Sequence, residues 1–330
     1  MSHSNSSLNT FTYCQRKYWH NYINHTKPDV PPSPHLTFGT MAHEVLCKAG
    51  EMRDLQGVVP ADEYMTVIPS ELIYTDLKDF FGIKNWHHYF HYVILETAKI
   101  EKQLVEMLKN ESGKPVGIER EVKLQLPPEA LLKGEMYNKF RPKQNLVGVI
   151  DLLLVSGDHA IIIDYKFSKE PKTQDNFDLD SQLYIYALFV NRLYGVPLRN
   201  IRVGYIDIPK SSFDSPLILK NGTLSRSKSQ NVSAEIYRLA VKAVHGDDDY
   251  YNCDEGGYYA DVIKELALKK AAYLSLQYVD IDALQYIILD IMQTMHTIDN
   301  YNVPNDIYLA KYDAYSCGSC EYRSSCKHWS

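Results

Sequence analysis

The stretch that decides the fold is LVGVIDLLLVSGDHAIIIDYKFS, residues 146–168. It contains two apolar runs, Leu146 to Val155 and Ala160 to Tyr165, and an aspartate interrupts the first and nearly ends the second. The intervening SGD (156–158) is a turn signal, and two apolar strands joined by a short turn predict a β-hairpin. An unpaired carboxylate is costly to bury, so the two aspartates indicate a site.

The aspartates form a group with one lysine. Asp164 and Lys166 are two residues apart on a predicted strand, so their side chains project from the same face, and Asp151 can reach the same point from the neighbouring strand. Two carboxylates can hold Mg²⁺ or Mn²⁺, and Lys166 would orient or deprotonate the attacking water, or neutralise the transition state. The alternative is structural, because D-x-K after a Gly-Asp turn is common. An ion pair to Lys166 would satisfy only one aspartate.

Around the hairpin, the apolar pattern predicts a mixed α/β core. Residues 116–126 alternate like a half-buried strand, and a helix from about Leu179 to Tyr194 leads into a strand from Ile201 to Ile208. A first helix, capped by Ser6 or Ser7, ends at Pro28 to Pro34. Further helices are expected after Gly39 and at about 86–108, 233–245 and 259–300, with a loop or hairpin at 210–232 and a turn-like final thirty residues.

Two helices carry further candidate residues. Gln182 and Tyr186 are four residues apart and share a helix face, from which they could contact phosphate or position Lys166. They could equally be a surface amide and a core aromatic. His43, in FGTMAHEVL, could be another ligand, since imidazole suits Mn²⁺ or Fe²⁺ better than Mg²⁺. A solitary helical histidine is more often structural.

The cysteines form a second group. Cys317-x-x-Cys320 provides two thiolates on one turn, Cys326 adds a third, and Cys14 is the natural fourth. Six cysteines in 330 residues are too few for a disulfide scaffold, so metal binding is the better use. Spacing alone leaves zinc and an iron–sulfur cluster open. Three residues are less informative: Cys47 and Cys253, which lack companions, and His328, which could replace a cysteine ligand.

Composition sets the class of protein. The chain is 45% hydrophobic and 23% charged, enough for a large core in one elaborated domain or two. A net charge of −6 argues against indiscriminate coating of nucleic acid but permits a local basic groove. We expect a cytoplasmic protein, because no signal peptide or membrane-spanning stretch is visible. The chain has no phosphate-binding loop of the G-x-x-x-x-G-K-[ST] type, so it should not itself be an ATP-driven helicase.

Cations and aromatic residues follow Cys14 directly. Arg16, Lys17, Tyr18 and Trp19 could bind single-stranded DNA by pairing with phosphates and stacking on bases. A charged helix face backed by core aromatics is an equal alternative. A later basic set could clamp a strand or be merely solvated: Lys210, Lys220, Arg226 and Lys228.

Four motifs together resemble the RecB-type branch of the PD-(D/E)XK nucleases: Gly39-x-x-x-His43, Gly148-x-x-Asp151, Asp164-x-Lys166 and Gln182-x-x-x-Tyr186. The resemblance spans about 5–327 and implies a restriction-endonuclease-like mixed β-sheet core flanked by helices, with helical insertions and a C-terminal cysteine tail. It implies metal ligation by His43, Asp151, Asp164 and the Tyr165 carbonyl, catalysis by Lys166, and support from Gln182 and Tyr186. Glu119 or Glu121 could also approach the site. Phe167 departs from the small hydroxyl residue common after the lysine.

The cysteine pattern is similar to that of the iron–sulfur members of this branch, the AddB, Cas4-type and Dna2-type nucleases. The resemblance implies a 4Fe-4S cluster that joins residues 1–27 to 305–330, within a single nuclease domain of residues 1–330. The expected parts between these ends are a helical segment (40–112), a catalytic core (115–208), and a loop and helical extension (209–304).

The sequence therefore predicts a metal-dependent DNA nuclease, an exonuclease or flap-like enzyme acting on single strands or DNA ends. Its expected partners are DNA and a separate helicase or a recombination or CRISPR protein. One alternative is a catalytically idle nucleic-acid-binding or assembly subunit that keeps the fold. Another is a zinc-stapled structural protein.

Overall fold

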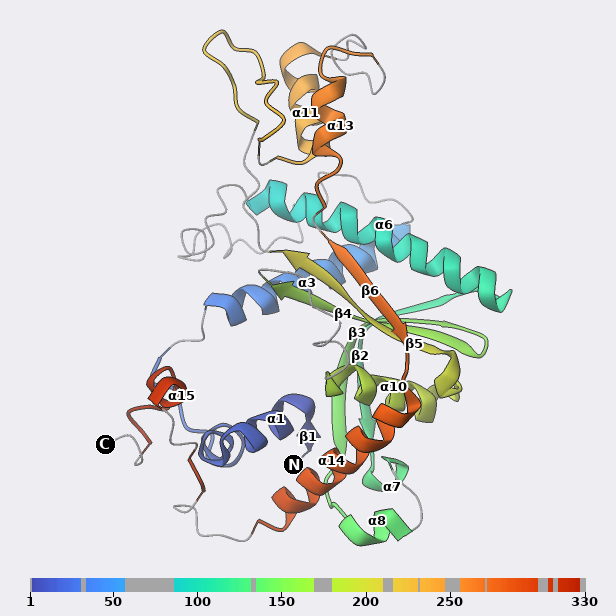
Figure 1. The fold of residues 1–330 in the computed structure, drawn as a ribbon, viewed down its shortest axis with the longest axis vertical. Helices are drawn as coiled ribbons and strands as arrows, with labels where there is room; N and C mark the ends of the chain where they lie inside the picture. Colours follow the sequence, from blue (N-terminus) through green and yellow to red (C-terminus); the bar gives the residue numbers. More distant parts are fainter. Residues whose placement is uncertain are drawn as a thin grey trace.

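A computed structural model describes residues 2–30, 34–56, 86–131, 135–168, 180–209, 216–230, 232–246, 256–270, 272–301, 308–310 and 314–326. Within these residues, a six-stranded mixed sheet crosses the middle of the molecule, with helices on both faces (Figure 1). The strand order is β1-β3-β4-β5-β6, and β2 pairs with β3 outside this path.

The strands are β1 (His3–Ser4), β2 (Gly117–Leu126), β3 (Leu146–Ser156), β4 (His159–Ser168), β5 (Ile201–Pro209) and β6 (Tyr273–Tyr278). The longer helices are α1 (Asn5–Tyr13), α3 (Pro34–Gln56), α6 (Trp86–Ser112), α10 (Ser181–Tyr194), α11 (Ala234–His245), α13 (Ala260–Leu266) and α14 (Ile281–Asp299). The short ones are α2 (Gln15–Tyr18), a π-helix (Trp19–Ile23), α7 (Pro128–Leu131), α8 (Glu135–Phe140), a 3-10 helix (Leu198–Asn200) and α15 (Ala314–Gly318).

The predicted hairpin forms the centre of the sheet. β3 and β4 pair antiparallel, and their turn contains Gly157 at a φ of 62°, a left-handed conformation that glycine adopts without strain. β4 then pairs in parallel with β5 through the crossover helix α10. α10 begins at the N-cap Asp180 and ends at Gly195, whose φ of 72° makes it a left-handed C-cap. The turn chemistry of the sequence therefore sets both connections.

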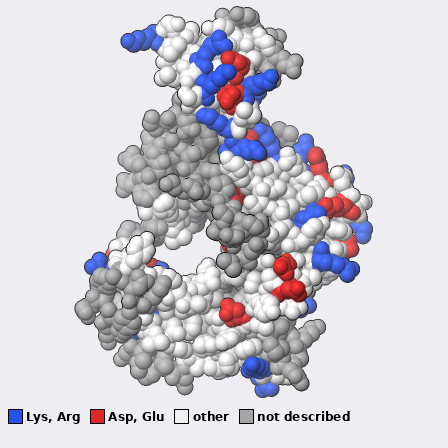
Figure 2. All heavy atoms as spheres, viewed as in Figure 1, with Lys and Arg blue, Asp and Glu red and all other residues white. Residues whose placement is uncertain are grey.

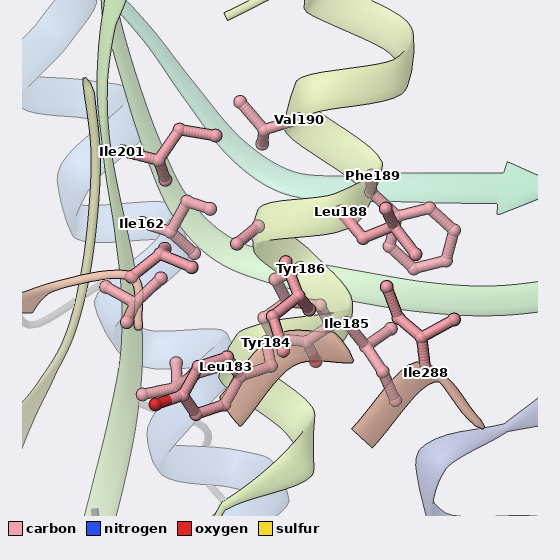
Figure 3. Packing of buried hydrophobic residues seen from close by; sticks show 14 of the residues in the cluster. Ile162, Leu183, Tyr184, Ile185, Tyr186, Leu188, Phe189, Val190, Ile201 and Ile288 are labelled. Atoms are coloured by element: carbon pink, nitrogen blue, oxygen red, sulfur yellow. The ribbon is translucent and has the colours of Figure 1, made fainter. Parts of the chain in front are cut away.

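The sheet separates two hydrophobic cores, because side chains alternate between its faces. Ile161 and Ile163 of β4 pack in the core that contains residues of α3 and α6. Ala160 and Ile162 pack in the core that contains residues of α10 and α14. Figure 3 shows Ile162 lying against the buried residues of α10. With both faces covered, the middle strands are apolar along most of their length.

Two regions lie outside this sandwich. α11 and α13 have a hydrophobic cluster of their own and form a separate lobe (Figure 1). The two ends of the chain pack together, since the Arg16 N–H donates to the Leu309 carbonyl at 3.0 Å and the Asp29 N–H donates to the Glu321 carbonyl at 2.7 Å. The segment around α1 and α2 therefore contacts the segment around α15.

Three predicted elements were wrong in extent or type. The helical pattern at 259–300 is divided between α13, the edge strand β6 and α14, because β6 completes an antiparallel pair with β5 that local periodicity does not reveal. α3 begins at Pro34, before Gly39, since proline is compatible with a first helical turn. Ser4 caps α1 through a reciprocal capping box, in place of Ser6 or Ser7.

Among the described residues, no helix combines the length and the apolar character that crossing a bilayer requires.

Candidate active site and cysteine cavity

Asp151, Asp164 and Lys166 come together on one face of the hairpin. Lys166 Nζ lies 2.6 Å from Asp164 Oδ2, and the Tyr165 N–H donates to Asp151 Oδ2 at 2.8 Å. Asp164 is only 3% exposed. The two carboxylates therefore stand at the same end of adjacent strands, with one held by an ammonium group and the other by the main chain.

The helix α10 supplies the next two residues. The Lys166 ammonium donates to Gln182 Oε1 at 3.1 Å, and Gln182 Nε2 donates to the Tyr186 hydroxyl oxygen at 2.6 Å. Asp180 fixes the start of the helix by accepting a bond from the Gln182 N–H at 2.9 Å. The glutamine and tyrosine therefore form a hydrogen-bonded row that ends on Lys166.

His43 reaches the same site from α3. Its Nδ1 lies 3.2 Å from Asp151 Oδ2, and its ring meets those of Tyr165 and Phe167 edge-on. His43, Asp151 and Asp164 consequently face one space with one imidazole and two carboxylates. Phe167, which departs from the family pattern, packs on the His43 ring and leaves these groups untouched.

The charges of the site perturb one another. Burial, followed by the charge of Asp151, raises the pKa of Asp164 to about 6. Burial alone would lower the pKa of Lys166, but the charge of Asp164 outweighs it and raises that pKa. Burial likewise opposes the charged form of His43, but the hydrogen bond that His43 donates to Asp151, with the charge of that carboxylate, outweighs burial and raises the pKa of His43. Lys166 is therefore a cation near neutral pH.

A groove of about 1270 Å³ opens onto these residues. It runs between α3, the edge of β2 and β3, and the first residues of α1, where the surface in Figure 2 is hollowed. Gly148 forms part of its floor, and a Cβ there would come within 2.9 Å of the Tyr186 ring and 3.0 Å of Phe189. The glycine of the Gly148-x-x-Asp151 motif thus permits close packing of α10 on β3.

The donor set fits a divalent cation. Carboxylates and an imidazole suit Mn²⁺, and the carboxylates with water suit Mg²⁺. In the described part of the chain, no group of three or more His, Cys, Asp or Glu side chains is arranged so that it could hold a metal ion. Asp164 instead pairs with Lys166, and Asp151 with His43.

The four predicted cysteine ligands line one small cavity between the chain ends. Cys14, Cys317, Cys320 and Cys326 all contribute to its wall, and none of them forms a disulfide. The Cys14 sulfur caps α2 by accepting a bond from the Lys17 N–H at 3.4 Å. Burial raises the pKa of Cys320, and the nearby Cys14 adds to the effect. Four cysteines are the residue types that zinc or a four-iron cluster takes as ligands, but among the described residues these four are not arranged as a metal-holding group.

The prediction that Arg16 and Tyr18 contact nucleic acid is not compatible with their positions. Tyr18 is 1% exposed and packs on Phe11, so no base can stack on it. Arg16 is 4% exposed and its guanidinium lies 4.5 Å from the centre of the Trp19 ring. Lys17 is half-buried and pairs with Glu321 at 3.0 Å. The position of these residues directly after Cys14 suggested that they bind DNA. In the structure, most of their side chains instead pack between the two chain ends.

Three of the later basic candidates, Lys220, Arg226 and Lys228, lie on the α11–α13 lobe, where Figure 2 shows Lys and Arg side chains gathered. Arg226 pairs with Asp261 at 2.9 Å and Lys228 with the same carboxylate at 3.7 Å, while Lys220 is exposed. Lys210, Cys253 and His328 lie outside the described residues.

The two glutamates of β2 differ in their position relative to the groove. Glu119 accepts a bond from the Tyr194 hydroxyl at 2.8 Å and does not line the groove, whereas Glu121 lines it. Glu121 has a φ of 47°, which is rare for a residue other than glycine. It stands opposite Asp151, since its neighbours Arg120 and Val122 pair with residues 152 and 150. No sequence signal distinguishes this glutamate.

Sequence reasoning also missed a set of charged residues behind β4. The Tyr165 hydroxyl points away from the site and donates to the buried Glu101 at 2.6 Å. Arg120 of β2 donates to the same carboxylate at 2.6 Å. Their positions in otherwise ordinary helix and strand patterns gave no indication of this contact.

Comparison with known proteins agrees with this geometry. The family model described as "PD-(D/E)XK nuclease superfamily" matches residues 2–327. No match is found among curated proteins. Among solved structures, one described as a "putative exonuclease" from Eubacterium rectale is 12% identical, with a TM-score of 0.44 over 99% of this chain and 87% of that one. The structure of SSO0001 is 11% identical, with a TM-score of 0.26 over 87% and 84%.

The structural likenesses are too weak to support an argument, but the family match covers nearly the whole chain. The restriction-endonuclease-like fold is confirmed, as a mixed sheet with helices on both faces. Nucleases of this superfamily generally use Mg²⁺ or Mn²⁺, which agrees with the donors of the groove. The chain belongs to the PD-(D/E)XK nuclease superfamily.

Proposed function

We propose that the protein is a metal-dependent deoxyribonuclease that hydrolyses phosphodiester bonds in single-stranded DNA or at DNA ends, as an exonuclease or flap-like enzyme. The observation that carries the proposal is the row Tyr186–Gln182–Lys166–Asp164, which meets the His43–Asp151 pair at the floor of an open groove. These contacts hold the Lys166 ammonium group at a fixed point beside the two carboxylates.

His43, Asp151 and Asp164, with the Tyr165 carbonyl, would hold Mg²⁺ or Mn²⁺. The bound cation supplies Lewis-acid stabilisation and a water of lowered pKa. Lys166 stays protonated, because Asp164 raises its pKa, so its role is to hold the attacking water and to neutralise charge on the phosphate. Gln182 and Tyr186 keep the ammonium group in place, because Gln182 accepts its hydrogen bond and is itself bonded to the Tyr186 hydroxyl.

A cleavage assay tests the proposal. End-labelled single-stranded, duplex and circular DNA are incubated with Mg²⁺ and with Mn²⁺. Asp164→Ala and Lys166→Ala are expected to abolish cleavage while remaining folded. Lys99→Ala is the control, because Lys99 forms an exposed ion pair with Glu96 on α6, outside the groove.

Persistent cleavage by both site variants contradicts the proposal. DNA binding without cleavage by the wild type would favour the idle-subunit alternative. Cleavage of circular single strands would exclude a strict exonuclease. A helicase, recombination or CRISPR partner, which would deliver the DNA end, stays a prediction.

We further propose that the cysteine cavity holds a 4Fe-4S cluster with a structural role. The support is that four cysteines from the two chain ends line one small cavity. Anaerobic purification should give a brown protein with about four irons and four sulfides per chain, as that cluster type requires. A colourless protein that contains zinc and no sulfide contradicts the cluster and favours a zinc staple.

A further inference from the structure

Behind the catalytic strand lies a buried group of charges that the proposed chemistry does not use. Glu101 of α6 is its centre. It accepts hydrogen bonds from the Tyr165 hydroxyl and from Arg120, each at 2.6 Å, and it also pairs with Arg53. Arg120 in turn donates from Nε to Asp54 at 2.7 Å. We call these five residues the Glu101 network.

The centre of the network is deeply buried, whereas Asp54 at its edge is exposed. Glu101 is 5% exposed, and the side chain of Arg120 is 3% exposed. Buried ion pairs contribute little net stability compared with apolar residues of similar volume, so their presence calls for another role.

The network joins four elements, two of which carry proposed ligands. Arg53 and Asp54 belong to the last turns of α3, about 15 Å along the helix from His43 at 1.5 Å per residue. Tyr165 belongs to β4, and its N–H holds Asp151 at 2.8 Å. Glu101 therefore ties the helix that carries His43 to the strand that orients Asp151.

Gly50 gives a separate indication that the contact between α3 and Arg120 is specific. It lies inside α3, where glycine is about 1 kcal/mol less favourable than alanine. A Cβ at this position would come within 2.3 Å of the Arg120 guanidinium. The helix therefore includes a residue that weakens it, at the point where α3 approaches Arg120.

We propose that Glu101 and Arg120 are positioning residues for the metal site, which hold His43 and Asp151 at a common spacing through α3 and Tyr165. The inference rests on the proposed metal-dependent function. It assigns no contact between the network and DNA.

Binding of Mn²⁺ to the full chain without DNA tests the inference, measured by titration calorimetry or by the electron paramagnetic resonance of free Mn²⁺. Tyr165→Phe keeps the ring and removes only the hydroxyl bond to Glu101. We expect Mn²⁺ affinity to fall about 10-fold, as for residues that orient metal ligands elsewhere. Tyr194→Phe is the matched control, because it removes a similar tyrosine–glutamate bond, to Glu119, outside the groove. Its affinity should equal that of the wild type.

A second pair of variants lies on one helix. Glu101→Gln weakens the network, and Glu111→Gln breaks the bond pair with Arg202 at the far end of α6. Only the first should weaken Mn²⁺ binding, although both remove an arginine ion pair. Gly50→Ala, which displaces Arg120 without removing any charge, should weaken binding as Tyr165→Phe does.

Wild-type Mn²⁺ affinity in folded Tyr165→Phe and Gly50→Ala proteins would overturn the inference while leaving the proposed function intact. Absence of Mn²⁺ binding by the wild type would instead overturn the proposed function, and the inference with it. Equal losses in the Glu101→Gln and Glu111→Gln variants would show a general effect of α6 and also overturn the inference.

Discussion

The groove and the cysteine cavity, the two proposed metal sites, are built in opposite ways. The groove gathers oxygen and nitrogen donors from adjacent strands and one helix, and it is open over about 1270 Å³. The cavity is small and gathers sulfur donors from the two ends of the chain. An open site admits water and substrate, whereas a closed site with four protein ligands serves structure. The two proposed roles, catalysis in the groove and stapling at the chain ends, thus fall to candidate ligands that differ in softness and in their distance along the sequence.

The largest expected effect is on catalysis. Lys166→Gln removes the ammonium group that joins Asp164 to Gln182, and kcat should fall by about 10²–10⁴-fold, the usual contribution of a positioned catalytic group. Mn²⁺ affinity should be kept or increased, because a cation that competes for Asp164 is lost. Single-turnover cleavage and Mn²⁺ titration measure the two effects. If metal binding were lost together with activity, Lys166 would instead be needed to hold the metal ligands in place.

The next effect is on stability at the other site. Cys320→Ser should lower the free energy of unfolding by about 3–5 kcal/mol, because the proposed cluster would lose a ligand and would no longer join the distant chain ends. Chemical denaturation of the metal-loaded protein measures this, with wild type stripped by a chelator as the control. The stripped wild type and the variant should then be equally stable. An unchanged stability would show that the cavity does not staple the ends.

Metal binding in the groove should weaken as the pH falls. Burial raises the pKa of Asp164 to about 6, so this carboxylate takes up a proton as the pH falls through 6 and loses its ligand character. Below this value, Mn²⁺ affinity should fall by up to about tenfold per pH unit for each proton displaced. Because the pKa of His43 is also raised, the fall in Mn²⁺ affinity should begin at a higher pH than Asp164 alone would give. Titration calorimetry at pH 5 to 8 measures it, and a flat profile would exclude Asp164 as a ligand.

The smallest effect concerns packing under the groove. Gly148→Ala places a methyl group against the rings of Tyr186 and Phe189, and overpacking of this kind costs about 1–3 kcal/mol. Gly39→Ala is the control, since its Cβ would meet nothing within 4 Å and alanine favours the helix by up to about 1 kcal/mol. Thermal denaturation should therefore show opposite shifts. Equal shifts would remove the packing role assigned to Gly148.

Much of the site was predictable because its residues follow short-range rules. The alternation of a strand places Asp164 beside Lys166, and the pitch of a helix places Gln182 beside Tyr186. The SGD turn paired the two strands and brought Asp151 to the same end. These relations depend on a few neighbouring residues, so sequence alone was sufficient.

The rest depended on contacts between distant segments. β6 looked helical because its local pattern is ambiguous, and only the edge of β5 makes it a strand. Tyr18 looked available to DNA, but the packing of Phe11 buries it. No periodicity relates Glu101 to Tyr165, 64 residues away.

By itself, the sequence determined the order of the catalytic motifs, the central hairpin and the four candidate cysteines, because each is encoded in local spacing or residue type. Only the tertiary structure decided that Glu121 rather than Glu119 lines the groove, that Arg16 is used in packing, and that Glu101 ties α3 to β4. The physical reason is that burial and ion pairing depend on which surfaces meet. That information is spread over the whole chain and is absent from any short segment.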